Sequence, residues 1–217
     1  MADSPENSAS DLQIDVVSHP LARHLVTHLR DASTKPALFR TIANHLTTVL
    51  ALEATRDLPV RSEEVATPLE VVQGDVLATG LVVVPILRAG LGMLPAIVEL
   101  FPDVSVGYIG LARDETTAVA SPYYQKLPRI RDRVVLVVDP MLATGGSACQ
   151  ALDAVKEAGA KDIRLVCVVA APEGVALVNA QHPDVRIVAG ALDRALNAQK
   201  YILPGLGDFG DRLYGTP

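Results

Sequence analysis

The segment that decides the fold is VVLVVDPMLATGGS, residues 134–147. Its first five residues are apolar without alternation, which is typical of a strand buried on both faces of a parallel sheet. Asp139 follows at the carboxyl end of this strand, and a short loop then closes with Thr-Gly-Gly-Ser at a predicted helix start. Because ligands bind beyond the carboxyl ends of parallel strands, this segment indicates both a fold class and a site.

The loop has the chemistry of a phosphate-binding site. Gly145 and Gly146 let the backbone approach an anion, and the helix start offers unpaired N–H groups. Thr144 and Ser147 add hydroxyl donors. The sequence here matches neither a Walker A loop nor a GxGxxG dinucleotide fingerprint. The alternative interpretation is a tight turn with a helix cap and no ligand, but the buried strand and Asp139 favour a phosphate-binding loop.

Strands and helices alternate around this segment. We predict strands at residues 81–86, 104–109, 133–138, 163–170 and 185–189, and helices at residues 91–100, 146–158 and 173–181. Helical spacing also covers residues 20–53, with a helix start near Pro36, and short β-type pieces at 56–80 indicate an extension or hairpin arm. The pattern predicts an α/β fold, a mostly parallel central sheet with helices on both faces. We expect one domain over residues 1–217, of which 1–13 form a loose tail.

Composition narrows the function. The chain has 217 residues and a net charge of -6, which argues against a general nucleic-acid binder. Neither a signal peptide nor a membrane-spanning apolar run is recognisable, so we expect a cytoplasmic protein. Cys149 and Cys167 are expected to be buried free thiols. His24 and His28 are four residues apart on a predicted helix, but a third metal ligand is missing, so we expect a helix face and not a metal site.

Three other segments carry candidate site residues. Arg88, in VPILRAGLGM (84–93), can fork onto a pyrophosphate or, alternatively, only form a salt bridge within its loop. The pieces GLARDET (110–116) and SPYYQKLP (121–128) follow the second strand. Lys126 is explained equally well as a solvated surface charge and as a residue of the site. The segment YILPGLGDFGDR (201–212) has too many glycines for a regular element and is too apolar for a tail. Such a loop can offer backbone groups to a planar ligand.

From about His19 to Thr216 the sequence resembles the uracil phosphoribosyltransferases, a branch of the type I phosphoribosyltransferase superfamily. In that superfamily, a strand followed by an acidic residue and by T-G-G-S/T at a helix start is the signature of a binding site for phosphoribosyl pyrophosphate (PRPP). Asp139-Pro140, in place of two adjacent acids, is the form of the uracil branch. The resemblance implies the type I fold with N-terminal helices, a β-arm and a C-terminal hood loop. It also implies that residues 110–128 form a mobile flap, which would exclude water from the ribosyl centre.

The resemblance also implies site residues. Those expected to be catalytic are Asp139, Arg88, Arg113 and Asp208. The expected PRPP contacts are Arg88, Arg113, Asp139, Pro140, Met141, Leu142, Ala143, Thr144, Gly145, Gly146, Ser147 and Asp208, and the expected uracil contacts are Ile202, Gly207, Asp208 and Phe209. Asp208 is a candidate for the general base or for a weak Mg²⁺ ligand, with the ion held mainly by PRPP and water. Two residues differ in size from common relatives: Ala112 in the flap, and Phe209, which is expected to alter the pocket rim.

The implied activity is that of a pentosyltransferase, a glycosyltransferase that salvages uracil. It transfers the 5-phosphoribosyl group from PRPP to uracil with the help of Mg²⁺, giving UMP and pyrophosphate. A homo-oligomer, dimer or larger, and activation by GTP are further expectations of the resemblance. One alternative is a sister enzyme for hypoxanthine or orotate, which Asp139-Pro140 and Gly207-Asp208 disfavour. The other is a PRPP-sensing regulator that binds nucleic acid, which the acidic chain without room for another domain disfavours.

Overall fold

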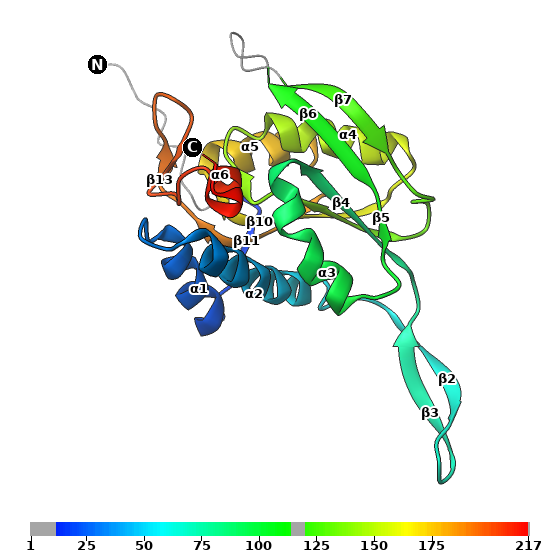
Figure 1. Ribbon diagram of the computed structural model, residues 1–217. Coiled ribbons are helices and arrows are strands. Elements are labelled where there is room, and N and C mark those ends of the chain that lie inside the picture. Colours follow the sequence, from blue (N-terminus) through cyan, green and yellow to red (C-terminus); the bar gives the residue numbers. More distant parts are fainter. Residues whose placement is uncertain (1–11, 114–119, 217) are drawn as a thin grey trace.

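The protein is described by a computed structural model that covers residues 12–113 and 120–216. Its centre is a twisted sheet of strand order β1-β11-β10-β8-β4-β6-β7, whose neighbours are parallel except β6 and β7 (Figure 1). The strands are β1 Asp15–Val16, β4 Leu81–Leu87, β6 Tyr108–Arg113, β7 Ala120–Lys126, β8 Val134–Val138, β10 Asp162–Ala170 and β11 Arg186–Leu192, with the short β5 Ser105–Val106 beside β4 and β9 Met141–Leu142 beside β10. The expected α/β sheet is confirmed.

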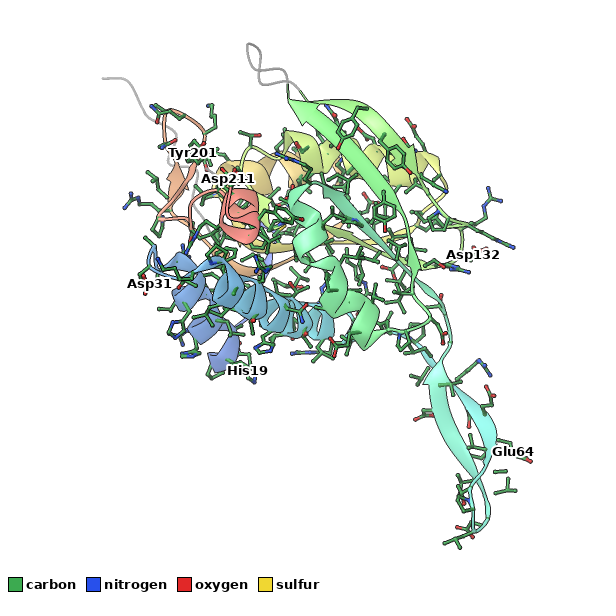
Figure 2. The ribbon with its side chains drawn as sticks, in the orientation of Figure 1. His19, Asp31, Glu64, Asp132, Tyr201 and Asp211 are labelled. Carbon is green, nitrogen blue, oxygen red and sulfur yellow. The ribbon has the colours of Figure 1, made fainter. Side chains whose placement is uncertain are left out.

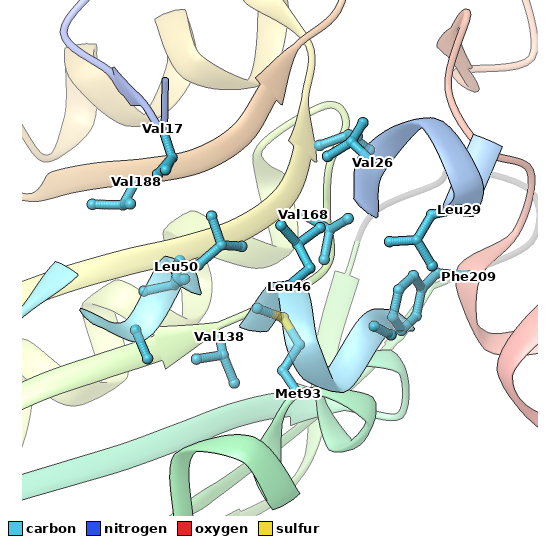
Figure 3. Packing of buried hydrophobic residues seen from close by; sticks show 14 of the residues in the cluster. Val17, Val26, Leu29, Leu46, Leu50, Met93, Val138, Val168, Val188 and Phe209 are labelled. Atoms are coloured by element: carbon cyan, nitrogen blue, oxygen red, sulfur yellow. The ribbon is translucent and has the colours of Figure 1, made fainter. Parts of the chain in front are cut away.

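Both faces of the sheet are covered by helices because both faces of its strands are apolar. Val134, Leu136 and Val138 of β8 enter one core, and Val135 and Val137 enter the other. Figure 3 shows part of the first core, where helix residues pack against strand residues. The helices of the first face are α1 Pro20–Arg30, α2 Pro36–Ala54, α3 Leu94–Leu100 and α6 Phe209–Tyr214, and those of the second are α4 Gly146–Glu157 and α5 Pro172–Gln181.

The helical stretch predicted at residues 20–53 is two helices with a break after α1. The carboxylate of Asp31 accepts hydrogen bonds from the backbone N–H of Ser33 (2.8 Å) and from its hydroxyl (2.7 Å), and this turn ends α1. Pro36 then occupies the first turn of α2, as expected. The helix predicted at 91–100 begins instead as a 3₁₀ helix, η2 Ala89–Gly92, before α3.

The expectation that residues 201–212 form no regular element is wrong at both ends. Ile202–Leu203 is a strand, β13, paired antiparallel with β12 Ala195–Leu196. At the other end, Oδ1 of Asp208 accepts a hydrogen bond from the N–H of Asp211 (2.9 Å) and caps α6. Only the residues between these elements form the irregular hood loop. The pairing of β1 with β11 was likewise not predicted.

The predicted arm is a long antiparallel hairpin, β2 Val60–Ala66 and β3 Val71–Leu77, that projects from the body (Figure 1). Every residue of β2 is exposed, and Leu69 at the tip is 95% exposed. In the part of the chain that the structure covers, no helix combines the length and apolar character that crossing a bilayer requires. Cys149 and Cys167 are buried and free, as expected.

Between α4 and α5 a histidine is buried without a good partner. His182 is 3% exposed, its Nε2 lies 3.7 Å from Oδ1 of Asp153, and neither ring nitrogen has a hydrogen bond in the described structure. Burial lowers the pKa of His182 from its ordinary value of 6.5, and the charge of Lys156 lowers it further, against the opposing effect of Asp153 and Asp184. The unfolded chain therefore binds a proton here at a higher pH than the folded chain does.

We expect His182→Gln to flatten the pH dependence of stability. In the wild type, the free energy of unfolding should fall as the pH drops below the unfolded pKa, because protonation favours the unfolded chain. Urea denaturation of both proteins at about pH 7.5 and about pH 5.5 measures the difference. An equal loss of stability in the two proteins over this interval would contradict the assignment.

Candidate active site

A pocket of about 340 Å³ opens at the carboxyl edge of the sheet. Four segments that are far apart in the sequence line it: the end of β4 with η2, a residue of β6, the loop from β8 to α4, and the hairpin β12–β13 with the hood loop. The lining residues are Ile86, Leu87, Arg88, Ala89, Leu111, Asp139, Met141, Ala143, Ser147, Gln199, Lys200, Tyr201, Ile202, Gly207 and Asp208. The structure thus brings together residues from each of the predicted site segments.

The loop after β8 is held firmly against β10. The carbonyl of Pro140 accepts hydrogen bonds from the N–H groups of Val168 and Val169 (3.1 Å each). The carbonyl of Leu142 accepts one from Ala171 (2.8 Å), and β9 continues the pairing with β10. A loop attached to a central strand in this way presents Asp139 and its backbone groups in a fixed arrangement.

The helix start beyond this loop can bind an anion. Gly145, the N-cap of α4, has φ 85°, and a Cβ there would lie 2.9 Å from the carbonyl oxygen of Gly174. A side chain at 145 would therefore be strained and crowded. Gly146 differs, because the nearest atom to an added Cβ is Oγ1 of Thr144 at 3.9 Å. The first N–H groups of α4 have no partner within the helix, and Ser147 of this turn lines the pocket.

Arg88 lines another part of the pocket. It follows β4 after a cis peptide bond with Leu87 and precedes η2. An added Cβ at Gly90 would lie 2.5 Å from the carbonyl oxygen of Val138, so η2 packs closely on the end of β8. This contact brings the Arg88 loop beside the strand that carries Asp139, and both residues line the pocket.

β13 and the hood loop that follows it line a third part of the pocket. Ile202, Gly207 and Asp208 line the pocket, and one carboxylate oxygen of Asp208 is already used to cap α6. Phe209 is 1% exposed, and its ring lies 5.2 Å from the ring of Phe39 in the core (Figure 3). The expectation that Phe209 alters the pocket rim is therefore wrong for its side chain, because the core takes up its bulk.

Other predicted residues lie beside the pocket or outside the described part. Pro140, Leu142, Thr144, Gly145 and Gly146 belong to the loop after β8 but do not line the pocket, and their contact with PRPP stays a prediction. Arg113 ends β6, but its side chain and residues 114–119 lie outside what the structure describes, as does the side chain of Ala112.

Sequence reasoning missed the tip of the β12–β13 hairpin, where Gln199, Lys200 and Tyr201 line the pocket (Figure 2 labels Tyr201). The side-chain oxygen of Asn197 accepts hydrogen bonds from the N–H groups of Gln199 (3.0 Å) and Tyr201 (2.9 Å) and fixes this turn. An asparagine that folds a short polar turn was the only available signal.

The chemistry of the walls is mixed. Arg88 and Lys200 supply cations, and Asp139 and Asp208 supply carboxylates. Behind the pocket, burial and then the charge of Asp139 raise the pKa of Cys167 well above its usual value, so this thiol stays neutral. No group of three or more histidine, cysteine, aspartate or glutamate side chains in the described residues could hold a metal ion.

Comparison with known proteins gives a consistent result. A family model described as uracil phosphoribosyltransferase matches residues 16–216. A uracil phosphoribosyltransferase of Bacillus pumilus is 50% identical over 206 residues, which cover 94% of this chain and 99% of the relative. One of Thermosipho africanus is 50% identical over 207 residues, which cover 94% and 100%.

Solved structures agree on the fold. A protein of Aquifex aeolicus superposes with a TM-score of 0.89 at 37% identity, covering 93% of this chain and 97% of the other. A protein of Giardia lamblia described as APRTase gives a TM-score of 0.51 at 16% identity, covering 70% and 80%. At that identity the second comparison supports the shared fold alone.

The two glycines of the loop allow a matched test. Gly145→Ala should lower the free energy of unfolding by about 1–2 kcal/mol, because alanine resists a left-handed backbone. Gly146→Ala should leave stability within about 0.5 kcal/mol, since its Cβ would meet Oγ1 of Thr144 at an ordinary contact distance of 3.9 Å. Denaturant unfolding of both variants measures this, and equal effects would mean that the strain at Gly145 is not as described.

Proposed function

Because the chain belongs to the uracil phosphoribosyltransferase family, we propose that this pocket transfers the 5-phosphoribosyl group from PRPP to uracil. The products are UMP and pyrophosphate, so the reaction salvages free uracil. The observation that carries the proposal is the meeting of the cradle after β8, Arg88 and the hood loop in one pocket. Membership of this family favours uracil transfer over the two alternatives weighed from the sequence, a hypoxanthine or orotate enzyme and a PRPP-sensing regulator that binds nucleic acid.

The phosphate end of PRPP fits the start of α4. Backbone N–H groups of residues 144–147 and the hydroxyl of Ser147 receive the 5′-phosphate, and the positive end of the helix dipole favours its charge. Asp139, on the adjacent strand end, accepts hydrogen bonds from the ribose hydroxyls. Because hydrogen bonds to β10 already order the loop, little further conformational entropy is lost when it positions the sugar for the reaction.

The diphosphate end of PRPP lies at Arg88. Substitution at the anomeric carbon passes through a state in which the ribose becomes positive and the leaving pyrophosphate gains negative charge. The guanidinium of Arg88 stabilises that charge with paired hydrogen bonds. Arg113 assists from the flap in this proposal, as expected from the family resemblance. The pocket is lined by two cations, Arg88 and Lys200, and by two carboxylates, Asp139 and Asp208. Cations can bind the phosphates of a substrate, and carboxylates can accept hydrogen bonds from its hydroxyls.

Uracil lies against the hood loop. The edge of uracil alternates acceptors and donors, and backbone groups near Ile202 and Gly207 can match this pattern without side chains. Asp208 lies at the same wall and is our candidate for the group that receives the uracil proton. Its other oxygen caps α6, which orients the carboxylate.

Mg²⁺ fits this site as a partner of the substrate. The pocket offers two carboxylates, Asp139 and Asp208, but the described residues form no metal cluster of their own. Mg²⁺ prefers phosphate oxygens, water and one or two carboxylates, so these residues would hold it together with PRPP. The ion would supply positive charge at the diphosphate.

We further propose that the protein is a homo-oligomer, a dimer or larger, and that the β2–β3 arm contacts another copy. Exposed apolar side chains on a projecting hairpin support this, because they are costly to leave in water and two strands alone are marginally stable. These side chains are Val60, Val65, Leu69, Val71, Val72 and Leu77. Activation by GTP, a single domain over the whole chain and a cytoplasmic location stay predictions from the sequence.

The proposed reaction is tested directly by mixing the protein with PRPP and a panel of free bases. Pyrophosphate release should occur with uracil and should be far slower with hypoxanthine and orotate. Omitting Mg²⁺ should suppress the release and restoring it should recover the rate, because the diphosphate then lacks its counter-charge. Turnover with another base and none with uracil would overturn the proposed function.

Arg88→Ala should raise the KM for PRPP by about tenfold or more, the effect of losing hydrogen bonds to a charged group. The KM for uracil should change little, since the hood loop is untouched. Initial rates over a grid of both substrate concentrations separate the two constants. An unchanged KM for PRPP would remove Arg88 from the diphosphate site.

A further inference from the structure

The hood loop is held in place by a partly buried ion pair that lies outside the pocket. Oδ2 of Asp193 accepts hydrogen bonds from Nη1 of Arg30 (2.8 Å) and from the N–H of Gly205 (2.9 Å). Oδ1 of Asp193 accepts a hydrogen bond from Nη2 of Arg30 (2.5 Å), and Nη1 of Arg30 also donates to the carbonyl of Gly205 (2.8 Å). We name Arg30, Asp193 and Gly205 the loop brace.

The brace satisfies both backbone groups of Gly205 at once. Its N–H and its carbonyl are each bonded to one member of the ion pair, so the orientation of the backbone on both sides of Gly205 is restricted. The side chain of Asp193 is 3% exposed, and that of Arg30 is 26% exposed. Hydrogen bonds to charged groups in such surroundings are stronger than those between neutral groups.

Each end of the brace is attached to a different part of the fold. Arg30 is the last residue of α1. Asp193 follows β11, and its N–H donates to the carbonyl of Ala170 at the end of β10 (2.7 Å). The ion pair thereby connects a helix end, the carboxyl edge of the sheet and the hood loop. Figure 2 shows Asp31, next to Arg30, and Tyr201 of the hairpin on the same side of the molecule.

A second arginine holds the next residue of the loop. Arg212 donates to the carbonyl groups of Leu206 (2.7 Å), Leu29 and Asp31 (2.5 Å). Its guanidinium also lies 4.5 Å from the centre of the Phe39 ring. The last turn of α1 therefore restrains the hood loop at two consecutive residues, just before Gly207 and Asp208 enter the pocket.

We propose that the Arg30–Asp193 pair is a positioning device that sets the affinity of the pocket for the base and leaves that for PRPP unchanged. This rests on the proposed function, in which backbone groups of the hood loop bind uracil. Such groups discriminate only while they keep their direction, because hydrogen bonds weaken steeply with angle. Most residues assigned to PRPP lie at the end of β4, in the loop after β8 and at the start of α4, and none of them belongs to the brace. Of the two that lie elsewhere, Arg113 ends β6, and Asp208 of the hood loop is held by its own hydrogen bond from the N–H of Asp211.

Stability alone is a weaker explanation for the pair. Buried ion pairs often contribute no more to stability than apolar residues of similar size, because desolvation offsets their attraction. Here the pair also takes both hydrogen-bonding groups of a loop glycine that would otherwise be buried without partners. Its geometry is therefore specific to the direction of the loop backbone.

Asp193→Asn tests the inference. The amide oxygen can still accept a hydrogen bond from the N–H of Gly205. Its NH₂ group then faces the donor Nη2 of Arg30, so the hydrogen bond between Arg30 Nη2 and residue 193 is lost. We expect the KM for uracil to rise by about tenfold and the KM for PRPP to stay within about twofold. The reverse pattern is expected of Arg88→Ala, so the two variants cross-check each other.

A matched control removes a carboxylate from another buried arginine. Oδ1 of Asp57 accepts a hydrogen bond from Nη1 of Arg164 (2.5 Å), whose side chain is 5% exposed, at the amino ends of the strands. Asp57→Asn should lower the melting temperature and leave both KM values unchanged. If Asp193→Asn does not fold, Arg30→Lys provides the test, because lysine keeps the charge but cannot make the paired contacts with Asp193 and Gly205.

The result supports the inference if only the KM for uracil rises in the brace variants. It is overturned if both KM values rise together, or if neither changes in a folded variant. If the wild type releases pyrophosphate with uracil and the brace variants have the same KM values as the wild type, the inference about the brace is wrong and the proposed function stands. A wild type that does not use uracil would overturn both.

Discussion

All parts of the pocket depend on the hydrogen bonding of β8 to β4 on one side and to β10 on the other. Val138, the last residue of β8, lies beside Pro85 of β4 and Val166 of β10. Because the three strands are parallel, the residues that follow them meet at one edge. Arg88 and Asp139 face one pocket for this reason, although they come from separate segments of the chain. The two cores that flank β8 hold this edge in place.

The sequence predicted the elements whose signals are local. The run at residues 134–138 could only be buried on both faces, and its two alternating sets of side chains do enter two cores. The glycines of TGGS predicted a helix start that can bind an anion. Gly145 is the N-cap of that helix and has a left-handed backbone, which glycine adopts readily. The arm and the main helices followed from turn residues and apolar spacing in the same way.

The features that sequence reasoning missed depend on contacts between distant residues or on very short elements. β1 is two residues long and exists only because β11 offers a free edge. Phe209 was placed at the pocket rim because its neighbours belong to the site, but Phe39 of α2 provides a core position for its ring. Nothing local marks Arg30 or Asp193 as partners, since any surface helix can end in arginine.

The loop brace has a consequence for how the protein is made. Its partners are 163 and 175 residues apart in the chain, and Arg212 and Leu29 are 183 apart. Contacts of such high sequence separation form late, because the intervening chain must first be ordered. On the ribosome, the loop after β8, our proposed phosphate site, is synthesised well before Arg212, which donates a hydrogen bond to the hood loop. A nascent chain that ends before Arg212 therefore lacks the hydrogen bond that holds the hood loop, our proposed uracil site, at Leu206.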